Sequence, residues 1–230
     1  MKTYTNGKTI TPIAFIKTDF NEKFGIPRQS GRVPSLYGEV IFLPKFNNID
    51  FIKGLENFSH IWLVFGFSKV EEEPSSATVR PPRLGGNTKV GVFATRSPFR
   101  PNRLGLSSCK LEKIKYDNNQ LSLIVSGIDL LNDTPIYDIK PYLPTSDCHT
   151  DAIGGFADEY ANHKLQVVCD EELLSIVGPE KRQALLDCIA EDPRPSYQND
   201  QRIYGFAFAG VNVKFTIKDN TATILQIEKQ

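Results

Sequence analysis

Short segments rich in β-branched and aromatic residues, separated by glycine, proline and asparagine, dominate the first half of the chain. They predict strands over residues 10–17, 38–43, 60–67, 89–94 and 104–114. Between them, only residues 50–58 place apolar side chains near helical spacing, and that helix is short. A doubly wound α/β fold needs a crossover helix between parallel strands, so this pattern excludes it. The sequence favours a mainly β fold built on an antiparallel barrel.

Residues 110–125 predict a β-hairpin. The turn-like residues 116–120 are followed by 121–128, in which apolar residues mostly alternate with small ones. The sequence lacks the strand–GxGxxG–helix unit of the commonest dinucleotide and adenosylmethionine sites, because Gly85-Gly86 is a doublet with nothing helical after it. A cofactor of that class would need a different kind of site.

The chain changes character after Pro144. Residues 145–162 are polar and small and predict a linker, and two helical pieces follow within 171–190, separated by Gly178-Pro179. Strands are predicted over 204–208, 211–217 and 222–227. We therefore expect a barrel domain over 1–145, a linker over 146–163 and a small α+β domain over 164–230.

Composition bounds the class of protein. The chain has 230 residues, of which 40% are hydrophobic and 23% charged, and its longest apolar run is strand-sized, which is typical of a globular protein without membrane helices. The polar first residues lack the apolar core of a signal peptide, so we expect a cytoplasmic protein. Four cysteines and three histidines show no ligand spacing, so we expect neither disulfides nor a bound metal.

Net charge is zero, but the charge is unevenly distributed. No Asp or Glu occurs between residues 80 and 110, while this stretch holds seven basic residues: Arg80, Arg83, Lys89, Arg96, Arg100, Arg103 and Lys110. A charge run is usually a solvated face, but the density of glycine and proline here favours a surface that contacts phosphates.

Residues 94–107, ATRSPFRPNRLGLS, pack three arginines and two prolines into one connection between strands. One interpretation is a rigid loop in which Arg96 bonds its own carbonyl groups. The alternative is an anion site, because guanidinium groups without nearby carboxylates need external acceptors and suit carboxylates or phosphates.

These residues resemble the signature of the TsaA-like (TrmO) family of methyltransferases. Further segments agree with it in order: Pro27-Arg28-Gln29, residues 55–62, residues 127–135 and the Asp138–Tyr142 segment DIKPY. Residues 192–197, DPRPSY, resemble a C-terminal motif of the longer, bacterial-type members. The resemblance thus covers nearly the whole chain.

The resemblance implies a dimeric, single-sheet β-barrel enzyme that uses S-adenosylmethionine to methylate N6 of threonylcarbamoyladenosine at position 37, in the anticodon loop of tRNA. The cofactor residues that it implies are Pro27, Arg28, Gln29, His60, Ile61, Arg96, Leu106, Asp129, Leu130, Leu131 and Asn132. His60 is assigned by resemblance alone, since a lone histidine at a strand start is more often structural.

Chemistry suggests roles for some of these residues. Arg28 or Arg96 could hold the carboxylate of the cofactor, and Asp129 could accept hydrogen bonds from its ribose or amino group, or merely form a turn. Asp138 and Tyr142 are candidate bases for the N6 proton. Their alternatives are a structural strand end with a local ion pair, or a base supplied by the substrate's own carboxylate.

Arg80, Arg83, Arg100 and Arg103 are candidate phosphate contacts, and Phe99 and Tyr142 are candidate stacking partners for unpaired bases, unless they belong to the core. Two other functions remain open from the sequence. One is a non-catalytic RNA-binding barrel, and the other is a methyltransferase that uses the same cofactor on another acceptor.

Overall fold

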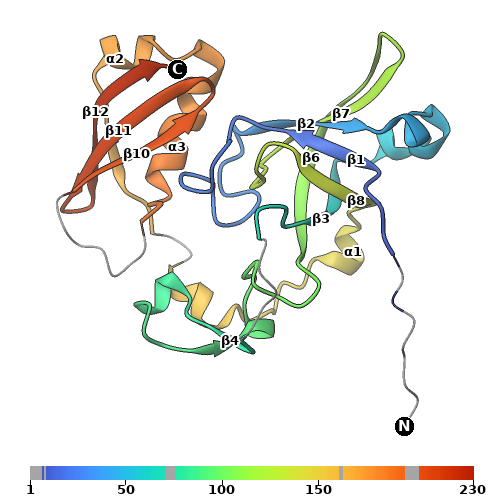
Figure 1. Ribbon diagram of the computed structural model, residues 1–230, viewed down its shortest axis with the longest axis horizontal. Coiled ribbons are helices and arrows are strands. Elements are labelled where there is room, and N and C mark those ends of the chain that lie inside the picture. Colours follow the sequence, from blue (N-terminus) through green and yellow to red (C-terminus); the bar gives the residue numbers. More distant parts are fainter. Residues whose placement is uncertain (1–6, 8, 71–75, 161–162, 195–201) are drawn as a thin grey trace.

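A computed structural model describes residues 7, 9–70, 76–160, 163–194 and 202–230, apart from the side chains of Arg83 and Tyr160. Its larger part is a closed antiparallel barrel in the strand order β1–β2–β7–β6–β3–β8, with β8 pairing back onto β1 (Figure 1). The barrel strands are β1 (Ala14–Lys17), β2 (Tyr37–Phe42), β3 (His60–Gly66), β6 (Leu104–Asp117), β7 (Gln120–Ser126) and β8 (Thr134–Pro141). The expected mainly β, antiparallel barrel is confirmed.

Apolar side chains at alternate positions along the strands fill the interior of the barrel. In β3, Ile61, Leu63 and Phe65 are buried, and in β7 so are Leu121 and Leu123. Successive side chains of a strand point to opposite faces, so one set of alternate residues forms the core. Each fully buried side chain of this size contributes about 1.5–3 kcal/mol.

The hairpin expected over residues 110–125 is confirmed as β6 and β7. Asp117 pairs with Gln120, and the two residues between them, Asn118 and Asn119, have φ values of 50° and 60°. Asparagine tolerates this left-handed backbone better than most residues, and two such positions match the right-handed twist of a hairpin. Local sequence chemistry therefore sets the register of this strand pair.

The strand expected over residues 89–94 is wrong for most of its length. Only β5 (Val90–Gly91) is extended, and it pairs with β4 (Thr78–Val79) outside the barrel, before the single turn η5 (Val92–Ala94). Both the backbone N–H and the hydroxyl of Thr95 donate to the carbonyl of Val92, at 3.1 and 2.8 Å, which turns the chain away. We call residues 76–103, which include η4 (Pro82–Leu84), the projection (Figure 1).

Two further expectations are corrected in detail. The first strand begins at Ala14, because Ile10 is exposed and has no sheet to pack against. Residues 50–58 form no α-helix but two 3-10 turns, interrupted at Gly54, whose φ of 92° breaks the helical backbone. The connection from β2 to β3 contains three such turns, η1 (Pro44–Phe46), η2 (Ile49–Ile52) and η3 (Leu55–Asn57).

The C-terminal part is a second, smaller unit with a sheet in the order β10–β11–β12–β9, where only β9 runs parallel to its neighbour among the described strands. Its elements are β9 (Gln166–Val168), α2 (Glu171–Ser175), η7 (Pro179–Lys181), α3 (Arg182–Ala190), β10 (Ile203–Phe208), β11 (Val211–Lys218) and β12 (Thr221–Lys229). The segment expected to be a linker overlaps the end of α1 (Pro144–Asp147) and contains η6 (Gly155–Tyr160). None of the helices in the described part of the chain combines the length and apolarity that crossing a bilayer requires.

The connection between β1 and β2, residues 18–36, joins the two units. Its Phe20 ring lies 5.3 Å from that of Phe208, centroid to centroid, and is fully buried. Ion pairs flank this aromatic contact: Asp19 with Lys181 at 2.6 Å and Arg32 with Glu191 at 2.7 Å. The connection is therefore held on one side by the C-terminal unit.

Candidate functional site

A cleft of about 650 Å³ lies beside strands β3 and β6, between the β1–β2 connection and the projection. It gathers residues that are far apart in the sequence. Its walls are formed by Pro27, Arg28, Gln29, Trp62, Phe65, Phe67, Phe93, Thr95, Arg96, Pro98, Arg100, Pro101, Asn102, Leu104, Gly105, Leu106, Ser107 and Asp129. A volume of this size is typical of small-molecule and cofactor sites.

Arg96 links two walls of the cleft. Its Nη1 donates a hydrogen bond to the side-chain oxygen Oε1 of Gln29, so the projection is tied to the β1–β2 connection. The interpretation in which Arg96 bonds the carbonyls of its own loop is therefore not what the structure shows. Its guanidinium is largely exposed, and it lines the cleft as a cation.

Asp129 is an acidic group of the same cleft. Ser107 donates to its carboxylate through Oγ at 2.7 Å. Burial raises the pKa of Asp129, although the hydrogen bonds from Ser107 and from backbone N–H groups, including that of Ser30, and the charge of Arg96 act in the lowering direction. The carboxylate is thus held as an oriented acceptor close to a cation.

Apolar side chains form the rest of the cleft, and close packing shapes them. Phe65 lies directly against Gly105 on the paired strand, where a Cβ atom would overlap the ring. The Trp62 ring is fixed because its Nε1 donates to Asp147 at 2.8 Å. Leu106 is 52% exposed and Phe93 is 77% exposed, so both offer apolar surface to a ligand.

Six of the predicted cofactor residues meet in this cleft. They are Pro27, Arg28, Gln29, Arg96, Leu106 and Asp129, and the predicted phosphate contact Arg100 joins them. Ile61 and Leu130 are instead buried in the core, while His60 and Leu131 lie outside the cleft lining. The Asn132 side chain supports the β1–β2 connection, because its Oδ1 accepts from the backbone N–H of Thr18 at 3.2 Å.

The two candidate bases are not brought to the cleft. Asp138 lies on β8, and its carboxylate is 3.2 Å from the ammonium group of Lys140, which is the local ion pair expected if Asp138 is structural and not a base. The Tyr142 ring contacts those of His60 and Trp62. Desolvation and the nearby Cys148 and Asp147 raise the pKa of Tyr142, which keeps its phenol protonated at neutral pH and leaves little phenolate to accept a proton.

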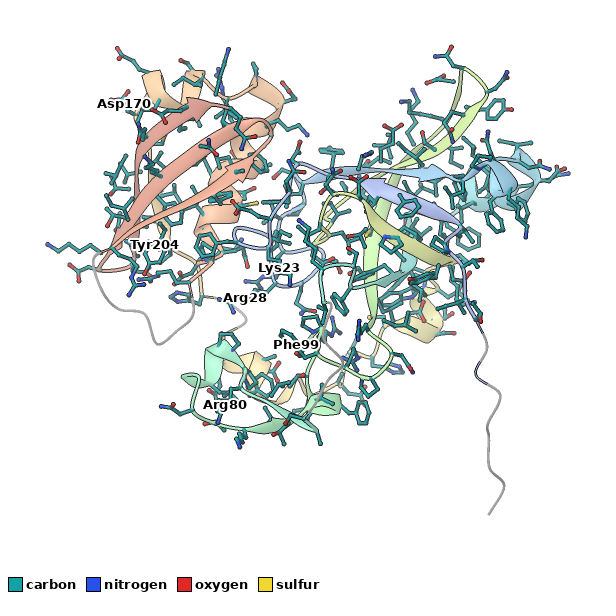
Figure 2. All side chains as sticks on the ribbon, in the orientation of Figure 1. Lys23, Arg28, Arg80, Phe99, Asp170 and Tyr204 are labelled. Atoms are coloured by element: carbon teal, nitrogen blue, oxygen red, sulfur yellow. The ribbon has the colours of Figure 1, made fainter. Side chains whose placement is uncertain are left out.

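The basic residues of the projection differ in their contacts. Arg100 donates to the carbonyl of Thr95 at 3.1 Å, and Arg103 donates to that of Val70 at 2.8 Å, so both also brace the loop. Arg80 is exposed on the arm of the projection, and Phe99 lies where the projection meets the barrel (Figure 2). The side chain of Arg83 lies outside the described residues.

Sequence reasoning missed Trp62 and Phe93 as cleft residues. Trp62 follows His60-Ile61 in a segment that carries the family resemblance. Neighbouring residues of a strand point to opposite faces, so the burial of Ile61 in the core indicates that Trp62 faces away from it, on the side of the cleft. Phe93 was missed because it was assigned to a strand. In the described part of the chain, no three His, Cys, Asp or Glu side chains group in a way that could hold a metal ion.

Comparisons with known proteins find relatives along nearly the whole chain. Residues 15–148 match the tRNA-methyltransferase O N-terminal domain, and residues 162–230 match the TrmO C-terminal domain. The tRNA (adenine(37)-N6)-methyltransferase of Escherichia coli K12 is 36% identical over 225 residues, which are 94% of this chain and 96% of that protein. A Pseudomonas aeruginosa protein, RcsF, whose name assigns it S-adenosylmethionine-dependent methyl transfer, is 40% identical over 211 residues, 86% of this chain and 87% of its own.

The similarity to known proteins extends to the three-dimensional fold. The crystal structure of TrmO from Pseudomonas aeruginosa superimposes on this chain with a TM-score of 0.78 and 32% sequence identity, covering 97% of this chain and 100% of the other. The likeness therefore includes the barrel, the projection and the C-terminal unit together.

Proposed function

This chain belongs to the tRNA-methyltransferase O family, and we propose that it transfers a methyl group from S-adenosylmethionine to N6 of threonylcarbamoyladenosine at position 37 of tRNA. The observation that carries the proposal is the cleft, which brings Arg96 and Asp129 together beside an apolar wall. A cation, an acceptor and apolar surface complement the carboxylate, the hydroxyl or amino groups and the adenine of that cofactor.

The proposed cofactor contacts follow from this complementarity. Arg96 or Arg28 holds the carboxylate, Asp129 accepts from the ribose or amino group, and Leu106 packs on the base. When bound, the cofactor supplies an electrophilic methyl group on a good leaving group. The protein's task is then to align the acceptor nitrogen and exclude water, which needs positioning more than acid–base side chains.

We propose a homodimer, as the resemblance implies, in which His60, Ile61, Leu130, Leu131 and Asn132 complete the cofactor site. In one chain, Ile61 and Leu130 are core residues and the others stand apart from the cleft lining. A direct role for them therefore requires either main-chain contacts or a second copy beside the cleft. We place the activity in the cytoplasm, where the tRNA substrate is found.

The projection is the proposed tRNA surface. It carries the acid-free basic segment next to the cleft, so Arg80, Arg100 and Arg103 can contact phosphates of the anticodon loop while the target base enters the cleft. Phe99, which is 52% exposed, is the proposed stacking partner. Tyr142 is already in contact with Trp62 and serves the wall instead.

For the N6 proton we favour the carboxylate of the threonylcarbamoyl group over a protein base. The ion pair of Asp138 with Lys140 and the raised pKa of Tyr142 both argue against the two protein candidates. This choice also explains why the modified adenosine, and not plain adenosine, is the expected acceptor.

The test is incubation of the purified protein with labelled S-adenosylmethionine and tRNA from cells that lack the corresponding gene, with and without the threonylcarbamoyl group. We expect label only on the modified adenosine. Transfer to unmodified tRNA at an equal rate would overturn the acceptor, and failure to bind the cofactor would leave an RNA-binding barrel as the function.

A further inference from the structure

The segment that follows α3, residues 191–194, lies against the cleft residue Arg28. The Nη2 atom of Arg28 donates to the carbonyl oxygen of Arg194 at 2.5 Å and is 3.5 Å from that of Asp192. Figure 2 shows Arg28 between the C-terminal sheet and the barrel. A cleft residue of the barrel therefore has its guanidinium held by main-chain groups of the C-terminal unit.

The two carbonyls are held in place by an ion pair. The Arg194 guanidinium binds the Asp192 carboxylate in two-pronged fashion, with Nε–Oδ1 and Nη2–Oδ2 distances of 2.9 and 3.0 Å, and both side chains are 14% exposed. The backbone N–H of Arg194 adds a hydrogen bond to the same carboxylate at 3.3 Å. Two parallel charge-assisted bonds fix geometry as well as adding energy, so they constrain the backbone between Asp192 and Arg194.

We propose that Asp192 and Arg194 are positioning residues for the cofactor cleft: their ion pair presents two main-chain carbonyls to Arg28 and so fixes the Arg28 side chain in the cleft wall. This inference rests on the proposed role of Arg28 in cofactor binding. Arg28 stands beside Gln29, which is anchored from the opposite side by Arg96. Each of the two neighbours in this wall thus has its own anchor, one from the C-terminal unit and one from the projection.

The contact is distinct from the general attachment of the two units. Asp19–Lys181 and Arg32–Glu191 also join the β1–β2 connection to the C-terminal unit, but none of those four residues lines the cleft. Glu191 belongs to the segment that contacts Arg28, whereas Asp19 and Lys181 do not, so loss of the Asp19–Lys181 pair should loosen the interface without moving Arg28. This difference provides a matched control.

The experiment measures the dissociation constant of S-adenosylmethionine by calorimetry on the full chain. Arg28→Ala and Arg194→Ala should each raise it about tenfold, and the double variant should bind no more weakly than Arg28→Ala alone, because both act through one side chain. Lys181→Ala, which breaks an ion pair of 2.6 Å on the same connection, should leave it unchanged.

Asp192→Asn is a second route to the same result if Arg194→Ala fails to fold. Asparagine tolerates the φ of 48° at this position, while the charge of the pair is lost. Unchanged affinity in folded Arg194→Ala and Asp192→Asn proteins, or additive losses in the double variant, would overturn the positioning role alone. Unchanged affinity in Arg28→Ala would overturn the cofactor role of Arg28 on which the inference rests.

Discussion

Arg96 and Gln29, 67 residues apart in the sequence, are joined by a hydrogen bond from Nη1 of the arginine to Oε1 of the glutamine. This bond connects the projection to the β1–β2 connection, so two loops that are far apart in the sequence are tied together as adjoining walls of the cleft. It also orients the guanidinium, whose remaining N–H groups can then bind an anion bidentately.

Replacing Arg96 should therefore weaken cofactor binding more than it weakens the fold. We expect Arg96→Ala to raise the dissociation constant of S-adenosylmethionine about tenfold or more, because a charge-assisted contact to the carboxylate is lost. Calorimetric titration measures it. Lys89→Ala is the control, since Lys89 is exposed in the same basic segment but does not line the cleft. Equal affinity of wild type and Arg96→Ala would remove Arg96 from the site.

The buried carboxyl group of Asp129 predicts that the stability of the folded protein depends on pH. Burial raises its pKa in the folded protein, whereas the unfolded chain releases this proton near the ordinary value of about 3.9. The folded state thus holds the proton more tightly, and its stability falls as pH rises from below about 3.9 through the raised pKa, then stays reduced above it.

Asp129→Asn removes this effect and keeps an acceptor oxygen for Ser107. Urea unfolding should show the variant to be more stable than wild type at pH 7, with the difference vanishing below about pH 3.9, while cofactor affinity drops. Asp133→Asn, at an exposed carboxylate paired with Lys17, should show no such gain. A variant less stable than wild type at pH 7 would contradict the prediction.

Arg80 should act on tRNA alone. Arg80→Ala is expected to weaken tRNA binding and to reduce the slope of log affinity against log salt by about 1, because one phosphate contact disappears. Its thermal midpoint should not change, since Arg80 is exposed. Filter binding over a salt series gives the slope. Lys218→Ala, an exposed cation on β11 of the C-terminal sheet, should leave the slope as it is.

Gly105 should tolerate no side chain. A Cβ there would overlap the Phe65 ring, so Gly105→Ala is expected to lower the free energy of unfolding by about 1–3 kcal/mol and to distort the cleft. Gly91→Ala is the matched control, because no atom lies within 4 Å of the added methyl group. Comparable urea midpoints for the two variants would show that Phe65 can move aside without cost.

The two candidate bases should prove dispensable. Asp138→Asn and Tyr142→Phe are expected to keep most of the single-turnover rate on modified tRNA, because neither carboxylate nor phenol reaches the cleft lining. Rapid-quench measurement with saturating cofactor isolates that step. A loss of about 100-fold or more in either variant, the range expected for a general base, would instead assign that residue the proton.

Turn and helix-breaking residues in the sequence predicted those parts of the fold that neighbouring residues determine. The Asn118-Asn119 turn defines the hairpin, and the expected break between two helical pieces occurs at Gly178, after which Pro179 begins η7. Only a strand end at residues 138–142 was considered for strand β8, because Pro135 and Pro141 interrupt the usual signals and pairing with β1 and β3 makes the whole segment a strand. Residues 89–94 carried a strand pattern but left the barrel, so tertiary context overrode propensity there.

The cleft was predictable in composition but not in geometry. Six of the residues that the resemblance implied for the cofactor do line one cleft. The bond between Arg96 and Gln29 and the anchoring of Arg28 by residues 192–194 join segments whose proximity only the folded chain creates. Pro195–Tyr197, the rest of the DPRPSY segment, lie outside the described residues.

Trp62 gives the cleft an optical property. It is the single tryptophan of the chain, and its indole ring stands in the cleft with its N–H held by Asp147. All of the protein's indole emission therefore originates from one wall of this site. Changes in the wavelength or intensity of this fluorescence emission report on what occupies the cleft, without any added label.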